Sequence, residues 1–375
     1  MALRSFVNKN LMLVPGWRTN RKIVVFESDD WGTVRIPDTT VFNKLAQKNP
    51  ALESDHISRY DCIESNDDLT ALFEVLSSVK DSRGNNAVIT ADTIVANPDF
   101  EKIAAAGFKK YFYEAFPISL SRYAGRDKVM ELIAEGRKAG LYHPQFHGRE
   151  HVNVNQWLHA LQKANPDLSE AFAQHVFSIP YREGDKKRKN VVSAFDFEKE
   201  TEIEMHEKII TDGMNLFEKI FGFASKSFIA TTYVWHPRIE EYLKNCGVKY
   251  IQGIPYQYVP NPGGEWYKKK FHYTGQKNKQ DQLYIVRNAF FEPSLIKNTD
   301  AVSDCLKRVA LAFKWNKPAV ISTHRVNFIG SLVEKNRTQN LAKFKKVLSG
   351  IISKWPDVEF MTSDQLGDLI KAGKQ

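Results

Sequence analysis

Short apolar runs rich in β-branched residues alternate along this chain with longer stretches of helical periodicity. This alternation limits the possible folds more than any other feature. Strand-like runs occur at residues 22–26, 87–90, 110–113, 227–230, 248–251, 283–286, 319–322 and 358–361. Helical patterns lie between them, at 67–80, 99–106, 128–138, 156–176, 199–221, 239–245, 300–315 and 338–353. The alternation predicts an α/β protein with a mainly parallel sheet, which is either a closed barrel or an open doubly wound sheet.

The composition is that of a globular protein that can bury a substantial core. The chain has 375 residues, of which 42% are hydrophobic and 26% are charged. We find no internal repeat, no low-complexity segment and no long linker, so a single domain over residues 1–375 is predicted. Residues 255–282 are rich in proline, glycine, lysine and aromatic residues, and they are expected to form a loop or hairpin insertion within this domain.

Several classes of protein are excluded or disfavoured. No run approaches the roughly 18–20 apolar residues that cross a bilayer, which excludes an integral membrane protein. The cysteines, Cys62, Cys246 and Cys305, are few, odd in number and far apart, which argues against a disulfide framework and against a cysteine-based zinc site. No signal-peptide cleavage site follows the first residues, so we expect mature protein in the cytoplasm.

The charge balance is moderately basic, with 53 Lys and Arg against 44 Asp and Glu and a net charge of +9. The densest basic runs lie at residues 186–189 and 268–270. Solvated loop faces explain such runs most simply. Attraction to an anionic partner such as an acidic sugar is the alternative. No nucleic-acid-binding motif accompanies the runs, so nucleic acid is not an expected partner.

Ionisable residues follow three apolar segments directly, two of which are strand-like runs named above. Asp29 and Asp30 follow residues 23–26, a histidine-rich segment follows Leu141, and His324 follows residues 319–322. In parallel α/β folds the carboxyl ends of the strands form one rim, where active sites lie. These distant segments are therefore predicted to converge.

The residue types at these strand ends suit a metal site. Adjacent carboxylates such as Asp29 and Asp30 repel each other, and a cation relieves the repulsion; a solvated turn is the alternative. His143 and His147 are four residues apart, and Pro144 disfavours a helix there. Because four extended residues span roughly 13 Å, we expect a coiled loop that brings both histidines to one ion. Two imidazoles and one carboxylate suit catalytic zinc.

His324 has two possible explanations. It is either a buried histidine bonded to a backbone carbonyl or a general acid, because an imidazole can donate a proton near neutral pH.

Taken together, these motifs resemble those of the polysaccharide deacetylase superfamily, over roughly residues 20–370. Members of that family are metal-dependent amide and ester hydrolases on a distorted (β/α) barrel, often seven-stranded. The family's first motif is matched by the segment that ends in Asp29 and Asp30, and its pair of metal-binding histidines is matched in spacing by His143 and His147. Its last motif ends an apolar strand with a histidine that acts as the general acid, and His324 ends such a strand here.

The resemblance implies a zinc-dependent hydrolase that removes N- or O-linked acetyl groups from a sugar or glycan precursor. The basic charge balance adds an anionic precursor as an alternative. By the same resemblance, Asp29 acts as the base, His324 acts as the acid, and Asp30, His143 and His147 hold the metal. The arginine that orients the base in the family's third motif is absent from residues 227–237.

Further residues are expected to bind substrate, with local ion pairing or packing as the alternative for each. Arg287 is the candidate to replace the missing arginine or to bind a sugar acid. The others lie beside the histidines or near other strand ends: Trp31, Arg149, Glu150, His151, Tyr233, Trp235, Asn288 and Glu292.

Two rival functions remain at this stage. Related barrels include glycoside hydrolases, in which paired carboxylates cleave a glycosidic bond, and Glu292 is the candidate second acid. The absent arginine also fits a sugar-binding protein that has lost turnover.

Overall fold

The computed structural model describes residues 10–182, 191–262, 266–296 and 299–373. Its centre is a curled sheet of nine strands, all paired in parallel. The strands are β1 (Lys22–Trp31), β2 (Ile89–Ile94), β5 (Tyr142–Gly148), β6 (Ser227–Phe228), β7 (Tyr250–Gly253), β10 (Leu283–Val286), β11 (Ala289–Phe290), β12 (Ala319–His324) and β13 (Val358–Phe360). The α/β class and the parallel sheet are thus confirmed.

The order of the strands shows how the sheet curls into a barrel. It runs β10-β7-β6-β5-β2-β1-β12-β11, with β13 paired to β1 beside this path. The two ends of the path are neighbours in the chain, since the Arg287 N–H donates to Gly253 of β7 and the Asn288 N–H donates to Val320 of β12. One extended stretch, 283–290, therefore bonds to both edges of the sheet. If β10 and β11 are counted together, the path has seven positions, as the resemblance implies.

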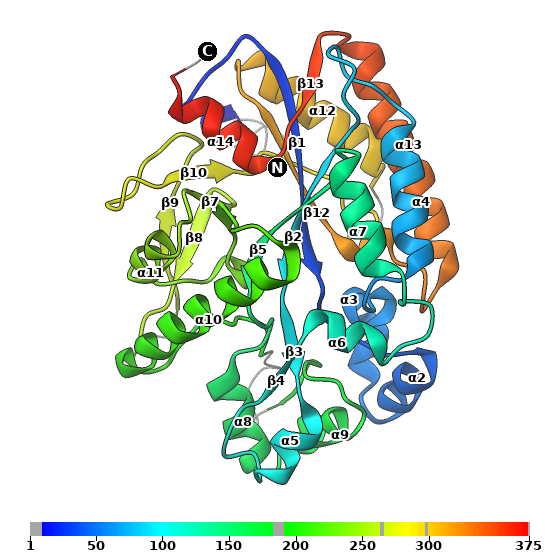
Figure 1. Cartoon of the computed structure of the whole chain (residues 1–375), viewed down its shortest axis with the longest axis vertical. Coiled ribbons are helices and arrows are strands. Elements are labelled where there is room, and N and C mark those ends of the chain that lie inside the picture. Colours follow the sequence, from blue (N-terminus) through cyan, green and yellow to red (C-terminus); the bar gives the residue numbers. More distant parts are fainter. Residues whose placement is uncertain (1–9, 183–190, 263–265, 297–298, 374–375) are drawn as a thin grey trace.

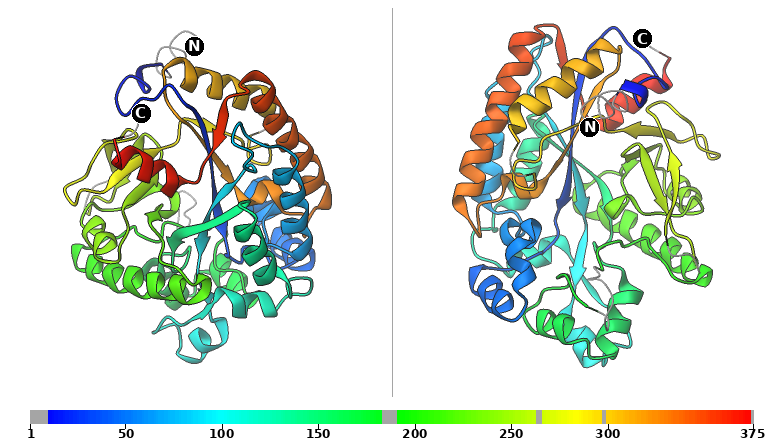
Figure 2. Two further views of the ribbon diagram at one scale, coloured as in Figure 1. Left: turned by 45° about the horizontal axis from the view of Figure 1, so that its top comes forward. Right: turned by 180° about the vertical axis from the view of Figure 1, so that it is seen from behind.

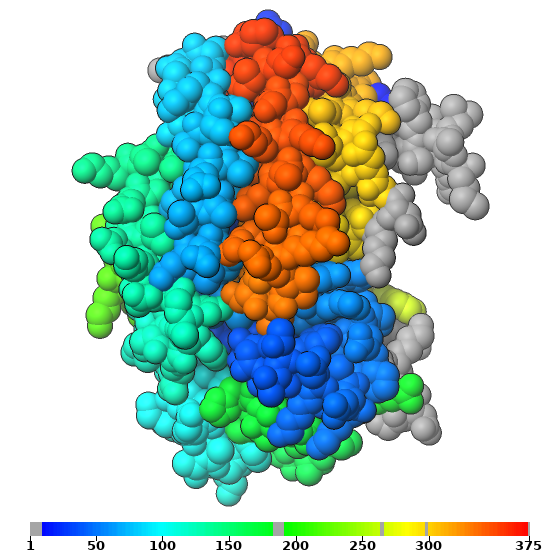
Figure 3. All heavy atoms as spheres, turned by 90° about the vertical axis from the view of Figure 1, so that its right-hand side faces the viewer, coloured from blue at the N-terminus to red at the C-terminus, as the bar shows by residue number. Residues whose placement is uncertain are grey.

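Helices cover the outside of the sheet, and several pack side by side (Figure 1). Along one flank α7, α4, α13 and α12 form adjacent columns, and Figure 3 views this flank directly. Along another flank α10 packs against α11 and β5. The bounds of these helices are α4 (Asn66–Ser77), α7 (Val129–Lys138), α10 (Ile203–Phe221), α11 (Ile239–Asn245), α12 (Ala301–Lys314) and α13 (Glu334–Lys354).

The two ends of the barrel are covered differently. Short helices gather beyond the carboxyl ends of the strands, whereas α14 lies at the opposite end (Figures 1 and 2). The short helices are α2 (Thr39–Lys48), α3 (His56–Tyr60), α5 (Phe100–Ala105), α6 (Phe116–Ser121), α8 (Val154–Gln162) and α9 (Pro166–Ala173), and α14 spans Ser363–Lys371. Two short strands, β3 (Ala96–Pro98) and β4 (Tyr113–Ala115), pair antiparallel in the same region.

The barrel interior changes from apolar to polar along its axis. At the amino ends of the strands, Ile23, Val25, Ile285 and Val320 form an apolar cluster with Leu366 of α14. Further along β1 the inward positions carry the buried side chains of Glu27 and Asp29. Because buried carboxylates are costly unless they are paired, this polar half of the interior requires partners, and it is where the candidate site lies.

Residues 255–282, where a loop or hairpin insertion was expected, contain an antiparallel hairpin of β8 (Tyr256–Val259) and β9 (Lys268–Phe271). The basic run 268–270 lies on the exposed β9. The other basic run, 186–189, lies outside the described residues. Among the helices that the structure describes, none has both the length and the apolarity that crossing a bilayer requires.

Candidate metal and acid–base site

The end of β1 turns its two aspartates apart. Its pairing with β2 shifts register between Ser28 and Trp31, and Asp30 has a φ of 77°, a left-handed conformation that aspartate tolerates better than most residues. Gly32 follows with a φ of +80°, and a Cβ there would lie 2.2 Å from the Ile94 carbonyl oxygen. This irregular strand end lets consecutive carboxylates face different partners.

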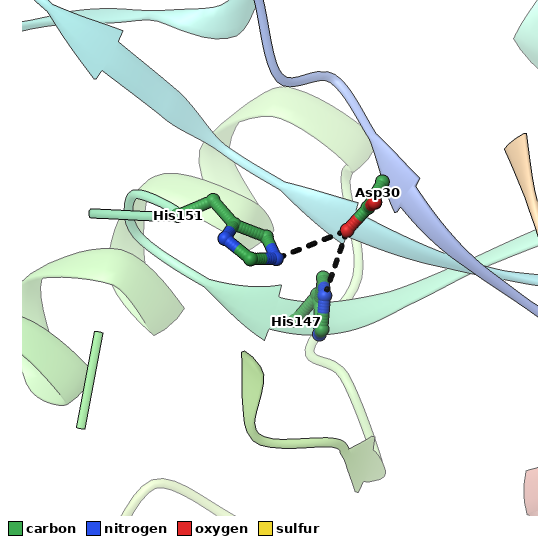
Figure 4. A group of neighbouring side chains, drawn as sticks. All are labelled: Asp30, His147 and His151. Atoms are coloured by element: carbon green, nitrogen blue, oxygen red, sulfur yellow. Dashed lines mark ion pairs between the residues drawn. The ribbon is translucent and has the colours of Figure 1, made fainter. Parts of the chain in front are cut away.

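Asp30 lies beside His147 and His151, and one ligand atom of each residue lies within 4.8 Å of the others. The Asp30 Oδ1 atom is 3.0 Å from His151 Nε2 and 3.4 Å from His147 Nε2 (Figure 4). All three side chains are buried. They come from the end of β1, the end of β5 and the loop that follows β5, so two strand ends and one loop converge here.

Hydrogen bonding decides which ring nitrogen of His147 faces Asp30. The Nδ1 atom lies 3.0 Å from the Ile229 carbonyl oxygen, which can only accept, so Nδ1 carries the hydrogen. A neutral His147 therefore presents an Nε2 lone pair toward the Asp30 carboxylate. Two acceptors at this distance repel each other unless a proton or a cation lies between them. A hydrogen bond from the other ring nitrogen, such as the one from Nδ1 to Ile229 here, is typical of metal-ligating histidines.

The electrostatics of the cluster also fit a cation. Burial lowers the pKa of His151 to about 4, with a further contribution from Arg35, so its ring is neutral at pH 7 and can act as a ligand. Burial raises the pKa of Asp30, but His151 and Arg35 outweigh it and hold this pKa well below its usual range. Tetrahedral zinc with bonds of about 2.05 Å separates its ligand atoms by about 3.4 Å, close to the 3.0 and 3.4 Å between Asp30 Oδ1 and the two histidine nitrogens.

The structure corrects the expectation for His143. Strand β5 remains extended from Tyr142 to Gly148, so His143 and His147 are both strand residues on one face, too far apart to share an ion. The His143 ring instead stacks on Phe223, and its Nε2 lies 3.4 Å from Asp364 of α14. The loop beyond Gly148 coils and returns His151, which the sequence analysis assigned to substrate binding, to the place expected for His143.

Asp29 is held by Arg287. The Arg287 Nη1 donates to Asp29 Oδ2 at 2.7 Å, and Nη2 donates to Oδ1 at 2.5 Å. Burial raises the pKa of Asp29, but Arg287 outweighs burial and keeps this pKa below its ordinary value. Asp29 is therefore an oriented carboxylate. The stretch 283–290 supplies the contact that the resemblance expects from an arginine on another strand.

Two further carboxylates share this arginine inside the barrel. Arg287 Nε donates to Glu27 at 2.6 Å, and Nη2 lies 3.2 Å from Asp92 Oδ2. Burial, and after it the charge of Asp29, raises the pKa of Asp92 well above its ordinary value. Ser363 Oγ, from α14, donates to the other oxygen of Glu27 at 2.6 Å. One guanidinium thus organises three buried acids, and Asp92 is a member that the sequence analysis missed.

His324 lies on the other side of Asp29. Its Nε2 atom is 3.7 Å from Asp29 Oδ2, and its Nδ1 is 2.7 Å from Glu292 Oε1. Burial lowers the pKa of His324, but Glu292 outweighs burial and raises it to about 10. Asn327 fixes the second Glu292 oxygen with a hydrogen bond of 2.8 Å. His324 is therefore an imidazolium at neutral pH, able to donate a proton.

Two tryptophans do not reach the site and correct the expectation of sugar stacking. Trp31 is fully buried, donates to Ser28 Oγ at 2.9 Å and packs edge-on against Tyr142. Trp235 is also buried, donates to Glu240 at 3.1 Å and stacks on His272. Both rings belong to the packed core outside the barrel.

Other expected substrate contacts are local structural contacts. Arg149 pairs with Glu150 at 2.6 Å and with Asp212 of α10 at 2.8 Å, so both Arg149 and Glu150 are committed to this ion pair. The Asn288 amide bonds to Pro318 and Val320 of the neighbouring segment and ties the two edges of the sheet together. These outcomes correct the expectation that Arg149, Glu150 and Asn288 line the site.

Tyr233 does reach the site, because its hydroxyl accepts from Arg287 Nη1 at 3.1 Å. Tyr233 and its neighbour Thr232 both have positive φ values, 61° and 56°. Strained backbone of this kind persists only where the surroundings fix it, and it is common at functional sites.

Arg35 is a second residue that the sequence analysis missed. Its Nη2 lies 3.5 Å from Asp30 Oδ2 and 3.4 Å from His151 Nε2. Its Nε has no hydrogen-bond partner among the described residues. No motif marks Arg35, since it lies in a loop after β1; only its nearness in sequence to Asp30 hints at a role.

Comparison with known proteins gives a distant likeness of fold. No family model matches the sequence, and no curated protein matches it. A Mycobacterium smegmatis structure named as a polysaccharide deacetylase is similar at 12% identity and a TM-score of 0.45, with 95% of this chain and 93% of that chain covered. An allantoinase structure is similar at 9% identity and a TM-score of 0.45, with 95% of this chain and 92% of that chain covered.

A GH57-type branching enzyme from Pyrococcus horikoshii is similar at 12% identity and a TM-score of 0.45, with 95% of this chain and 71% of that chain covered. Identities and scores of this size assign neither a family nor a reaction. The chemistry of this chain is therefore argued from its own residues.

Proposed function

We propose that this protein is a metal-dependent hydrolase that removes acetyl groups, N- or O-linked, from a sugar or glycan precursor. Asp30, His147 and His151 would hold the metal, most simply zinc, because the set contains two imidazoles, one carboxylate and no thiolate. A divalent metal held there would polarise the acetyl carbonyl and lower the pKa of a bound water.

The protein's own groups would then move the protons. Asp29 is ionised and oriented by Arg287, so it can accept the proton of the attacking water. His324 is protonated and oriented by Glu292, so it can donate a proton to the departing amine or alkoxide. The observation that carries the proposal is this pairing, in which an ionised acid and a protonated histidine lie 3.7 Å apart beside a three-ligand cluster.

The same contacts weaken the two rival functions. A glycoside hydrolase would need Glu292 as a free second acid, but Glu292 is engaged by His324 and Asn327. A binding protein without turnover was suggested by the missing arginine, and Arg287 makes the contact with Asp29 that the missing residue would make.

The proposal is tested by measuring acetate release from a panel of N- and O-acetylated sugars and nucleotide-sugars, with and without added zinc. We expect zinc-dependent release from at least one class, abolished by chelation and restored by metal. Acetate release that continues unchanged in the chelated, metal-free protein would contradict the proposal.

The pairing of Glu292 with His324 predicts a specific pH dependence. The pKa of His324 in the folded protein lies above the ordinary value for histidine. The ring therefore stays protonated through neutral pH and loses its proton as the pH rises toward that higher pKa. Glu292→Gln removes the charge that raises this pKa, so the alkaline limb of the kcat/KM profile is expected to move to lower pH. An unshifted alkaline limb in Glu292→Gln would show that His324 is not the titrating acid.

A further inference from the structure

A cavity of about 390 Å³ lies beside the barrel, between the stretch 283–290, α12, the end of the hairpin segment and the N-terminal residues 12–15. Most of its wall is apolar and comes from Leu13, Ile254, Val286, Phe290, Ile296 and Leu311. The volume and the lining are those of a small-molecule site.

Two charged side chains in the wall are bonded to protein partners. Lys317 donates to the carbonyl oxygens of Pro15, Gly16 and Trp17 at 2.7, 2.7 and 3.0 Å. Arg308 is bonded to its helix neighbour Asp304 at 2.8 Å. An occupant of this part of the cavity would therefore meet mainly apolar surface.

The N-terminal wall is firmly attached. Besides the three bonds from Lys317, the Trp17 N–H donates to Thr274 at 2.9 Å. Lys317 is only 4% exposed, and this burial, and after it Arg18, lowers its pKa to about 8. A lysine is rarely buried in this way unless its hydrogen bonds are satisfied. The three bonds from Lys317 therefore hold residues 15–17 in a defined position beside the cavity.

The cavity borders the acid–base half of the candidate site. Its lining includes Arg287, Glu292 and Ser322, which contact Asp29, His324 and Arg287 respectively, whereas none of the three candidate metal ligands is among its lining residues. In the proposed reaction the leaving group departs toward His324. The cavity therefore adjoins Glu292, the direct partner of the histidine that would protonate the leaving group.

Part of the lining is exposed apolar side chain. Met12 and Ile296, both in the lining, are 36% and 37% exposed, and Leu11 and Val14, which adjoin lining residues in the sequence, are 60% and 47% exposed. An apolar rim that continues an apolar cavity marks a surface that is covered when a ligand binds.

We propose that this cavity binds an aliphatic chain carried by the leaving-group part of the substrate, so that the substrate is an acetylated sugar joined to such a chain. The inference rests on the proposed function for the orientation of the substrate, but the binding of the chain can be measured without turnover. Burying one methylene contributes enough for an increase in affinity of up to about fourfold.

The test is calorimetric titration of the whole 375-residue chain with methyl, butyl, hexyl and octyl N-acetyl-β-D-glucosaminides, below their micelle concentrations, with and without zinc. We expect affinity to rise with each methylene in the unchanged protein. Ile296→Lys places a charge at the exposed rim, and Leu311→Trp fills the cavity from α12. Both variants should flatten the dependence on chain length while the methyl glycoside binds as before.

Ile118→Lys is the matched control, because Ile118 is 53% exposed on α6 and is not among the lining residues. This variant should keep the full dependence on chain length. An affinity that does not change with chain length in the unchanged protein, or an equal dependence in Ile296→Lys and Leu311→Trp, would overturn the inference. Acetate release is scored separately: its absence together with a clear chain-length dependence would count against the reaction and not against the cavity.

Discussion

Asp29→Asn is expected to lower kcat by about 10²–10⁴-fold, the usual contribution of a general base, while the metal content stays unchanged. The amide is nearly the same size as the carboxylate but cannot accept the proton of the attacking water. Asp29 makes its contacts with Arg287 and His324 and is not a member of the three-ligand cluster, so the substitution should leave the cluster intact. The measurement is kcat together with zinc per protein chain.

Asp281→Asn is the control for the loss of one negative charge, because Asp281 lies in an exposed ion pair with Lys277 far along the hairpin segment. Its activity should be unchanged. Near-normal turnover in Asp29→Asn would show that another residue is the base. Loss of metal in Asp29→Asn would show instead that both aspartates act as ligands.

Arg287→Met is expected to lower the free energy of unfolding by about 3–5 kcal/mol, the cost of removing one partner from a buried charge network. Glu27, Asp29 and Asp92 would remain buried without their shared cation. The measurement is urea denaturation at several pH values. Arg287→Lys should be more stable than Arg287→Met, because lysine keeps the positive charge, but less stable than the unchanged protein, because lysine cannot form the bidentate contact with Asp29.

The difference in the free energy of unfolding between the unchanged protein and Arg287→Met should become smaller at acidic pH. Arg287 holds the pKa of Asp29 below its unfolded value, so this stabilisation is present at neutral pH and is lost as the pH falls through the folded pKa. In Arg287→Met the buried acids take up protons more readily, and the two proteins converge. Lys48→Met, which removes an exposed ion pair with Glu170, should cost at most about 1 kcal/mol. A loss of similar size in Arg287→Met would contradict the account of the network.

Much of the fold could be predicted from the chain because each strand and helix has its own local signal. Residues 283–286 and 239–245 are a strand and a helix within the expected limits, and the α/β class follows from their alternation. The closure of the barrel could not be predicted in this way. It depends on Arg287 and Asn288, whose backbone amides bond to different neighbouring strands, and no local pattern encodes that change of partner.

In the candidate site too, some features could be predicted from the sequence and others depended on long-range contacts. Strand-end position was enough to anticipate that Asp29, Arg287 and His324 would lie together. His143 and His147 were assigned to the metal from their spacing, although the overlapping pair of His147 and His151 has the same spacing. The deciding fact is where β5 ends, and the ends of strands are set by tertiary pairing with β2 and β6.

Residues whose role depends on long-range burial were also missed or misassigned. Asp92 lies in a short strand that is buried throughout, and its partner Arg287 is distant in sequence. Trp31 follows the aspartates directly, but the register shift of β1 turns it into the core. Neither outcome can be derived from residue type and spacing alone, because each depends on which face of the sheet a side chain occupies.

The central claim is that Asp30, His147 and His151 hold one divalent metal ion, and the most direct measurement is elemental analysis of the purified protein and two single variants. His151→Ala and His143→Ala remove the same side chain from two positions that the sequence alone does not distinguish. We expect close to one zinc per chain in the unchanged protein and in His143→Ala, and almost none in His151→Ala. Metal that is lost in His143→Ala but kept in His151→Ala would contradict the site.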